Sequence, residues 1–314
     1  MKTFHLTHPH KLLSEKLPKT AASIGFFDGI HKGHQKVIQT AIDYAKKHEM
    51  ESAVITFHPH PSAILQPNRS EVKYITPLKQ KQEILQRMDV DRLYVITFNH
   101  ELSSLTPQEF IEEFIVGLHI HHLVAGFDFT FGHKGAGNME NIGSMTNNRF
   151  TYTTVQKVKN SKEKVSSTKI RKLLKEGNIP KVNHLLGRRL TTSGKVIGGE
   201  RRGRDLGFPT ANVSIDSDTM LPKKGIYAVK AIYKNITYEA IASLGVNPTF
   251  TPDSNDLKLE VHILDFEKEI YGEEITLEWY KFIRDEENFP SVDDLIRAME
   301  KDEKEVRKLF QTTS

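Results

Sequence analysis

A glycine-rich stretch near the start of the chain carries two histidines and an aspartate, in the order Gly25-Phe26-Phe27-Asp28-Gly29-Ile30-His31-Lys32-Gly33-His34. An apolar run precedes it and a helical pattern follows it, so we expect a turn between a strand and a helix. The apolar residues that share one face of this helix are Val37, Ile38, Ala41, Ile42 and Ala45. Backbone N–H groups and the positive end of the helix dipole meet at such a turn, which suits phosphate. His31 and His34 are three residues apart and face the same side of the first helical turn. The stretch predicts a phosphate site, with an ordinary loop as the alternative.

Three further stretches carry polar or aromatic side chains where we expect strands to end. In His58-Pro59-His60-Pro61, each proline keeps the preceding residue extended and so fixes where the histidines point. In Gly126-Phe127-Asp128-Phe129-Thr130-Phe131-Gly132, three phenylalanines around one aspartate suit a flat ring. In Val165-Ser166-Ser167-Thr168-Lys169-Ile170-Arg171, hydroxyls at a helix start together with a cation suit phosphate. The plainer alternatives are a rigid connector, an aromatic core cluster and a simple helix cap.

The second half of the chain begins with a basic loop studded with Gly194, Gly199, Gly203 and Gly207. Such a loop can cover phosphates, although it lacks the P-loop sequence pattern. It runs into Phe208-Pro209-Thr210-Ala211-Asn212, in which Thr210 and Asn212 are two residues apart at a strand start and point to one face. Neutral oxygen ligands together with ATP phosphates suit Mg²⁺. The alternative is a strand start with two polar surface residues.

Glu260 lies in a stretch with strict alternation, Leu257–Leu264. The apolar side chains share one face of the expected strand, and the other face carries Lys258, Glu260 and His262. Because polar strand faces usually meet water, the pattern alone indicates a solvated carboxylate.

Strands and helices alternate in the half of the chain that must position the first four stretches. We expect strands over Ser52–Phe57, Arg92–Phe98 and His122–Phe127, and helices over Leu78–Met88 and Pro107–Leu118, the last capped by Thr106. This rhythm predicts a parallel sheet with helices on both faces and with ligands at the carboxyl ends of the strands.

The rhythm changes near Gly187, after a short helix expected over Asn178–Leu186. We then expect strands over Thr210–Ile215, Gly225–Tyr233, Ile236–Leu244, Lys258–Leu264 and Ile275–Phe282, and helices over Val292–Met299 and Lys304–Phe310. Consecutive strands without crossover helices indicate an antiparallel barrel or sandwich. We therefore place a domain boundary between residues 186 and 187.

Composition narrows the class of protein. The 314 residues are 38% hydrophobic and 27% charged and include no Cys, which is typical of a globular protein of a reducing compartment. The N-terminus lacks the apolar stretch of a signal peptide, so we expect a cytoplasmic protein without a membrane partner. Residues 1–187 carry 25 Lys and Arg against 17 Asp and Glu, but these basic residues are scattered and no RNA-binding motif accompanies them. We therefore expect a polyphosphate such as ATP as the partner, and no nucleic acid.

Taken together, these stretches resemble the bifunctional bacterial riboflavin kinase/FAD synthetases. The segments G-x-F-D-G-x-H-x-G-H, F-x-P-H-P, G-x-D-F-x-F-G and S-S-T-x-I-R resemble the first domain of that family, and G-F-P-T-A-N with L-E-V-H-I-L-D-F and Tyr271-Gly272 resembles the second. The resemblance implies an α/β Rossmann-like nucleotidyltransferase domain with a parallel sheet, followed by a small antiparallel β-barrel domain with C-terminal helices.

The resemblance also implies roles for single residues. In the first domain, ATP would contact Gly25, Phe27, Asp28, Gly29, His31, His34, Ser167, Thr168 and Arg171. The flavin of the first domain would contact His60, Asp128 and Phe129, and the flavin of the second domain would contact Arg284. In the second domain, ATP would contact Gly194, Gly199, Gly203, Gly207, Pro209, Thr210 and Asn212. There Thr210 and Asn212 would hold Mg²⁺, and Glu260 would be the general base.

The implied activity is two sequential transfers from ATP. The second domain would phosphorylate riboflavin to FMN, and the first would join FMN to the adenylyl group of a second ATP, with pyrophosphate leaving. His31, His34 and Arg171 would assist the second transfer, and no protein partner is expected. Two alternatives stay open: an adenylyltransferase for a phosphate that is not a flavin, and a flavin-binding protein with degenerate sites.

Overall fold

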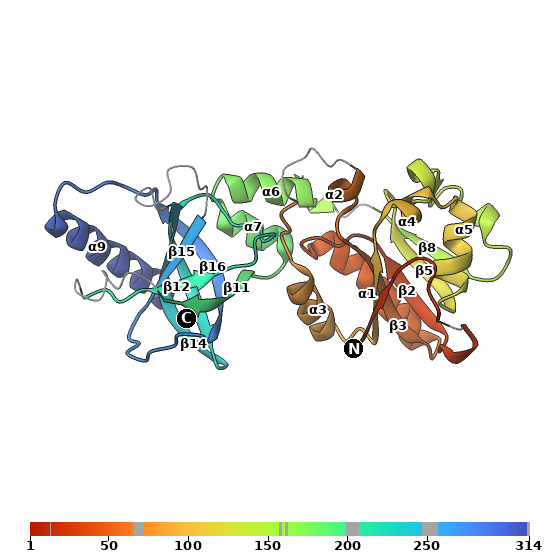
Figure 1. Cartoon of the computed structure of the whole chain (residues 1–314), viewed down its shortest axis with the longest axis horizontal. Helices are drawn as coiled ribbons and strands as arrows, with labels where there is room; N and C mark the ends of the chain where they lie inside the picture. Colours follow the sequence, from red (N-terminus) through yellow and green to blue (C-terminus); the bar gives the residue numbers. More distant parts are fainter. Residues whose placement is uncertain are drawn as a thin grey trace. The chain divides into compact units, whose positions relative to one another are not determined.

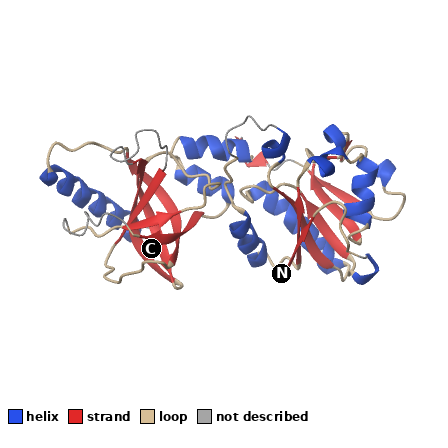
Figure 2. Cartoon of the chain, in the orientation of Figure 1, coloured by secondary structure: helices blue, strands red, loops and turns tan. Residues whose placement is uncertain are grey.

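The chain divides into two compact units, which a computed structural model describes over residues 1–12, 14–65, 72–156, 159–160, 163–198, 207–246 and 257–312. By their internal contacts the units are Met1–Ser167 and Thr168–Ser314. Figure 1 shows the course of the chain, and Figure 2 shows that each unit contains both strands and helices. None of the described helices is long and apolar enough to cross a membrane.

The first unit is built on a six-stranded sheet in the order β1-β4-β3-β2-β5-β8, and every neighbouring pair is parallel. The prediction of a parallel sheet is confirmed. From β2 the chain moves to β3 and β4 on one side, and it later returns to β5 and β8 on the other. Ligands of open α/β sheets bind where the strand order reverses in this way. The strands are β1 (Lys2–Leu6), β2 (Thr20–Ile24), β3 (Glu51–His58), β4 (Arg92–Thr97), β5 (Ile120–Gly126) and β8 (Thr151–Val155).

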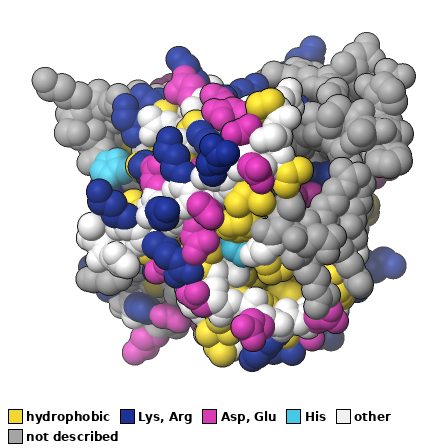
Figure 3. Space-filling view, turned by 90° about the vertical axis from the view of Figure 1, so that its left-hand side faces the viewer, with side chains coloured by type: hydrophobic (Ala, Val, Ile, Leu, Met, Phe, Trp, Pro, Cys, Tyr) yellow, Lys and Arg dark blue, Asp and Glu magenta, His cyan; other side chains and the backbone are white. Residues whose placement is uncertain are grey.

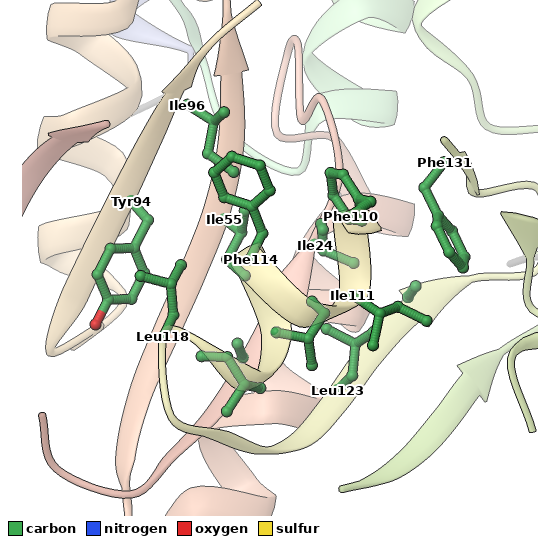
Figure 4. Close-up of a cluster of buried hydrophobic side chains, with 14 of the residues drawn as sticks. Ile24, Ile55, Tyr94, Ile96, Phe110, Ile111, Phe114, Leu118, Leu123 and Phe131 are labelled. Carbon is green, nitrogen blue, oxygen red and sulfur yellow. The ribbon is translucent and has the colours of Figure 1, made fainter. Parts of the chain in front are cut away.

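Helices cover both faces of this sheet. On one face lies α1 (Lys32–Lys47), whose buried residues are the five apolar positions that its periodicity predicts: Val37, Ile38, Ala41, Ile42 and Ala45. The other face is covered by α5 (Pro107–Ile111) and η2 (Glu112–Val116), and Figure 4 shows Phe110 and Phe114 packed over the strands. Each buried side chain of this size stabilises the fold by about 1.5–3 kcal/mol relative to exposure.

The helix expected over Pro107–Leu118 begins as predicted but does not continue as an α-helix. Thr106 accepts a hydrogen bond from the backbone N–H of Glu109, whose carboxylate accepts one from the Thr106 N–H in return. From Glu112 to Val116 the backbone is a π-helix, with the N–H of Gly117 donating to the Glu112 carbonyl at 2.8 Å. A Cβ at Gly117 would collide with the Glu113 carbonyl, so the glycine permits this wider turn.

The second unit contains a closed antiparallel barrel in the order β11-β12-β15-β14-β13-β16. The barrel prediction is confirmed, and five of its strands match expected segments to within two residues at each end. The sixth, β11, was not expected. The strands are β11 (Leu190–Ile197), β12 (Ala211–Ser214), β13 (Gly225–Tyr233), β14 (Ile236–Val246), β15 (Leu257–Ile263) and β16 (Glu274–Arg284).

Two helices are fixed to the barrel. In α7 (Ile179–Leu186), the Asn183 amide donates to the Trp279 carbonyl at 2.8 Å and its oxygen accepts from the Leu190 N–H at 2.7 Å. At the C-terminus, α9 (Val292–Gln311) is one continuous helix where the sequence predicted two. The residues expected to separate them, 300–303, include no Gly or Pro, so nothing in them interrupts the helical hydrogen bonds.

The face of the molecule on the side of α9 carries basic and acidic side chains interspersed, as Figure 3 shows. Charged residues of α9 form ion pairs: Arg307 pairs with Asp265 and Glu303, and Glu305 pairs with Lys281. The remaining described elements are α2 (Pro61–Leu65), α3 (Leu78–Arg87), α4 (His100–Ser104), α6 (Ser167–Lys175), β6 (Thr130–Phe131), β7 (Gly137–Asn138), β9 (Lys159–Asn160), β10 (Glu163–Lys164), η1 (Ser14–Lys16), η3 (His133–Gly135) and η4 (Ile142–Met145).

Candidate active sites

The two histidines of the glycine-rich turn stack on each other at the start of α1. Their ring centroids are 3.6 Å apart, and the His31 ring nitrogen Nδ1 accepts a hydrogen bond from the His34 backbone N–H at 3.2 Å. Burial lowers the pKa of His31 to about 4, and it lowers the pKa of His34 still more clearly, with the charges of His31 and Lys81 adding to the effect. Both rings are therefore neutral at pH 7, and they offer phosphate hydrogen bonds rather than positive charge.

The backbone of this turn is held by contacts from distant parts of the first unit. The Asp28 carboxylate accepts from the Thr76 N–H at 3.0 Å, and the Asp28 carbonyl accepts from the Ser167 hydroxyl at 2.8 Å. Phe27, Gly29 and Ile30 all have positive φ values, of 50°, 88° and 38°. Such values are costly for bulky residues and persist only where the surroundings impose them. The buried Asp28 thus braces the turn.

The turn and the loop that contains Asp128 follow neighbouring strands. Ile24 at the end of β2 pairs with Ala125 on β5, so the two loops leave the sheet side by side. The negative charge of Asp128, which is exposed, acts against the lowering of the His31 pKa. The structure therefore brings the predicted phosphate turn and the predicted flavin aspartate together at the point where the strand order reverses.

The three phenylalanines around Asp128 do not line one slot. Phe127 is 42% exposed, whereas Phe131 is 6% exposed and packs in the core. Phe129 is half-buried against the same core, with its ring 5.9 Å from that of Phe131. The three rings do not form one slot because the chain turns after Gly126, where the Phe129 N–H donates to the Gly126 carbonyl at 3.0 Å, so the alternation of an extended strand is broken.

His60 lies against the glycine-rich turn from the end of β3. Its ring packs edge-on to Phe26 with centroids 4.3 Å apart, and its Nδ1 accepts from the Ser62 N–H at 3.1 Å. The other predicted ATP contacts of the first domain lie on α6: Ser167 ends the first unit, and Thr168 and Arg171 follow in the second.

On the barrel, Asn212 and Glu260 face each other across neighbouring strands. They are direct partners in the antiparallel pairing of β12 with β15, which puts their side chains on the same face. Leu259 and Val261, on either side of Glu260, are buried, so the half-buried Glu260 lies on the outer face. Thr210 is two residues before Asn212, just ahead of β12, and is half-buried as well.

A second carboxylate, that of Glu286, lies near Glu260. It rests on the backbone of Gly245 in β14, where an added Cβ would collide with its Oε1 atom. The pKa of Glu286 is raised, first by burial and further by the negative charge of Glu260, while Lys224 acts in the opposite direction. The outer face of the barrel thus holds Glu286 near Glu260, which is itself paired with Asn212.

Arg284, the predicted flavin contact, is engaged with α9. Its Nη2 atom donates to the Asp302 carboxylate at 2.8 Å and its Nε atom donates at 3.0 Å, while Asp302 is buried. The guanidinium also lies 5.5 Å from the Phe289 ring. The structure thus gives Arg284 a part in fixing α9 to β16, and a flavin contact stays a prediction.

The predicted phosphate loop of the barrel is described only at its two ends. Gly199 and Gly203 lie outside the described residues. A Cβ at Gly194 would collide with the Ser214 carbonyl, so this glycine permits the close approach of β11 and β12. Gly207 has a φ of 84°, and the carbonyl of Pro209, two residues later, lies 2.8 Å from the His262 ring nitrogen. An open pocket of about 430 Å³ adjoins the end of β11, lined by Lys195, Val196, Ile197, Gly198, Tyr271 and Gly272.

Comparison with known proteins matches two family models to different parts of the chain. A family model described as FAD synthetase matches residues 13–169, and one described as riboflavin kinase matches residues 186–310. A curated bifunctional riboflavin kinase/FMN adenylyltransferase of Listeria monocytogenes is 44% identical over 310 residues, covering 99% of this chain and 98% of that protein. The chain belongs to the bifunctional riboflavin kinase/FMN adenylyltransferase family.

Further relatives agree with this placement. The family member of Bacillus subtilis is 41% identical, with 99% of this chain and 98% of that protein covered. A solved structure from Streptococcus pneumoniae, described as a macrolide-efflux protein, is 34% identical with a TM-score of 0.88 and covers 98% of this chain and 99% of that one. Its description names an activity different from that of the curated relatives. Its similarity to this chain supports the fold of both units.

Enzymes of this family generally use ATP and a divalent metal. Within the described ranges, no group of three or more His, Cys, Asp or Glu residues is arranged to hold a metal ion. Thr210 and Asn212 fit a different kind of site, in which a few neutral oxygen atoms share Mg²⁺ with substrate phosphates. The donor set on this face of the barrel is therefore compatible with Mg²⁺ bound together with ATP.

Two charged residues near these sites were missed from the sequence, Lys81 and Glu286. Lys81 is buried on α3 together with Ile84 and Leu85, three and four residues later. A lysine on the apolar face of an expected helix was the available signal, because such a position predicts burial. Glu286 lies two residues after Arg284, but no sequence pattern places it on Gly245.

Proposed function

We propose that the two units of this family member work in sequence, with the barrel phosphorylating riboflavin and the first unit adenylylating the FMN formed. The observation that carries this proposal is the presence of two separate candidate phosphate sites in one chain. One is the turn Gly25–His34, within the part matched by the FAD synthetase model, and the other surrounds Asn212, within the part matched by the riboflavin kinase model.

In the kinase step, Glu260 accepts the proton of the terminal ribityl hydroxyl as its oxygen attacks the γ-phosphorus of ATP. A new P–O bond forms, the bond to the β-phosphate oxygen breaks, and ADP leaves. The transition state of this transfer needs position and charge more than strong base catalysis, which a carboxylate can satisfy. Thr210 and Asn212 would hold Mg²⁺, which neutralises phosphate charge when bound. The pairing of Asn212 with Glu260 supports this arrangement.

In the adenylyl step, a phosphate oxygen of FMN attacks the α-phosphorus of a second ATP, and the bond to pyrophosphate breaks. No base is required, because the FMN phosphate is already ionised near neutral pH. His31 and His34 donate hydrogen bonds as neutral rings, since burial holds their pKa values low. Positive charge would come from Arg171, and Ser167 and Thr168 add hydroxyls at the start of α6.

The domain boundary after Leu186 and the cytoplasmic location stay proposals. The family models end and begin at residues 169 and 186, and the division by contacts falls after Ser167. The partners we propose are small molecules: ATP, riboflavin, FMN and FAD.

The decisive experiment is incubation of the purified chain with riboflavin, ATP and Mg²⁺, followed by chromatography. We expect FMN to appear first and FAD to follow, and both to disappear when the metal is chelated. Tight flavin binding without turnover would contradict the proposal. FAD formation from supplied FMN, measured separately, tests the adenylyl step alone.

A further inference from the structure

Lys81 is a buried lysine that neither proposed step uses. It lies on α3, is 4% exposed, and its ammonium donates to the Phe26 carbonyl at 2.8 Å and to the Thr56 hydroxyl at 3.1 Å. The ammonium also stands 5.1 Å from the centre of the Phe26 ring. Lysine is almost never fully buried unless a specific interaction compensates for its lost hydration.

The atom that Lys81 contacts belongs to the glycine-rich turn. Phe26 is the second residue of Gly25–His34, and its carbonyl accepts from both Lys81 and Thr56, the latter at 3.1 Å. The turn then passes through positive φ values at Phe27 and Ile30. Bulky residues keep such a conformation only where other contacts hold it. Lys81, far from the turn along the chain, is one of those contacts.

The Lys81 ammonium also places a positive charge next to the turn. Burial lowers the pKa of its ammonium to about 8, while the Asp28 carboxylate opposes this, so the group is mostly charged at pH 7. His34, which is neutral, also feels this charge, because the positive charge of Lys81 helps to lower the His34 pKa. Because the Lys81 ammonium is buried, little water screens its attraction for a polyphosphate bound at the turn.

We propose that Lys81 is a positioning residue for ATP in the adenylyl site: it holds the Gly25–His34 turn through the Phe26 carbonyl and supplies a buried positive charge behind the phosphates. This inference rests on the proposed function of that turn. Replacement of the lysine should weaken ATP binding in the adenylyl step, and it should leave the kinase step of the same chain unchanged.

The test compares Lys81→Met with Lys81→Arg and with Lys46→Met, which removes the same charge from an exposed position at the far end of α1. FAD formation is measured against ATP concentration at saturating FMN, and FMN formation from riboflavin is measured in the same preparations. For Lys81→Met we expect KM for ATP to rise about ten-fold or more in the adenylyl step, because a hydrogen bond to a charged group is lost. Lys81→Arg should recover part of the loss, and Lys46→Met should match the wild type.

A pH series adds a readout that a merely structural role would not change. Above pH 8, KM for ATP in the adenylyl step should rise in the wild type as Lys81 loses its proton, and it should stay flat in Lys81→Met. Unchanged adenylyl kinetics in Lys81→Met, or equal loss of both activities with a lowered melting temperature, would overturn the proposal. Absence of FAD formation by the wild type would instead contradict the proposed function itself.

Discussion

The two candidate sites hold phosphate-binding groups in opposite ways. In the first unit, the groups belong to a turn with unfavourable backbone angles, held from behind by Thr76, Lys81 and Ser167. In the barrel, Asn212 and Glu260 project from paired strands whose register alone puts them together. The candidate adenylyl site therefore depends on contacts between segments far apart in the sequence, whereas the candidate kinase site depends on regular strand pairing. Variants that separate the two activities test this contrast directly.

The largest expected effect is that of Glu260→Ala. FMN formation should fall by about 10²–10⁴-fold, because a general base is lost. Conversion of supplied FMN to FAD should stay close to that of the wild type, since the variant leaves the first unit untouched. Both rates are measured by chromatography on one preparation. Equal loss of both activities would contradict the assignment of the steps to two sites.

His34→Ala should give the converse result. FAD formation should fall by about 10²-fold, in line with the loss of a preorganised hydrogen-bond donor to phosphate. FMN formation should be unaffected, and His133→Ala, at an exposed position outside the turn, serves as the matched control. A normal rate of FAD formation in His34→Ala would show that the His34 ring does not take part in the adenylyl step.

On the barrel, Gly245→Ala tests whether the position of the Glu286 carboxylate matters for the kinase step. The new methyl group would displace the Glu286 carboxylate, which sits at the end of a flexible side chain, so the protein should remain folded. If Glu286 helps to shape the face around Glu260, KM for riboflavin should rise by a few-fold up to about ten-fold, the range of one modest polar contact. Steady-state kinetics of FMN formation measure this, and melting temperature provides the control. Unchanged kinetics would show that Glu286 has no role in the kinase step.

The smallest expected effect concerns the stability of the first unit in acid. Burial lowers the pKa values of His31 and His122 from 6.5 to about 4, so below pH 6.5 the unfolded chain binds protons that the folded chain does not. The free energy of unfolding should therefore not depend on these histidines above pH 6.5, the pKa in the unfolded chain. It should fall by roughly 2–3 kcal/mol per histidine as the pH drops to about 4, the pKa in the folded chain. Urea unfolding at neutral pH and at about pH 5, inside this window, measures the change. His122→Gln should reduce this pH dependence, and an unchanged dependence would contradict the burial argument.

Local patterns in the sequence predicted much of the fold. The periodicity of α1 gave its buried face residue by residue, and Thr106 marked the start of α5 through its cap. Strand β11 was missed because its sequence, LTTSGKVI, is mostly polar. One of those polar groups is nevertheless buried: the Thr192 hydroxyl accepts from the Trp279 indole at 2.9 Å. That partner lies 87 residues away, so no local pattern could show it.

The sequence predicted the candidate sites less completely than it predicted the fold. The chemistry of Gly25–His34 and the alternation around Glu260 could be read from nearby residues, but the neutral state of the histidines follows from burial, which only the fold determines. Lys81 and Glu286 lie far along the chain from the groups they contact, the Phe26 carbonyl and Gly245. Isolated charged residues give no sequence signal of this kind, because their partners are set by tertiary packing.

Closure of the barrel has a consequence for how this protein aggregates. Among the described residues, each of its six strands has a neighbour on both sides, so closure leaves the barrel without an edge strand. The sheet of the first unit ends at β1 and β8, each of which has one neighbour among the described strands, and β8 carries the exposed Tyr152. Intermolecular strand addition on heating should therefore begin at the edges of the first unit.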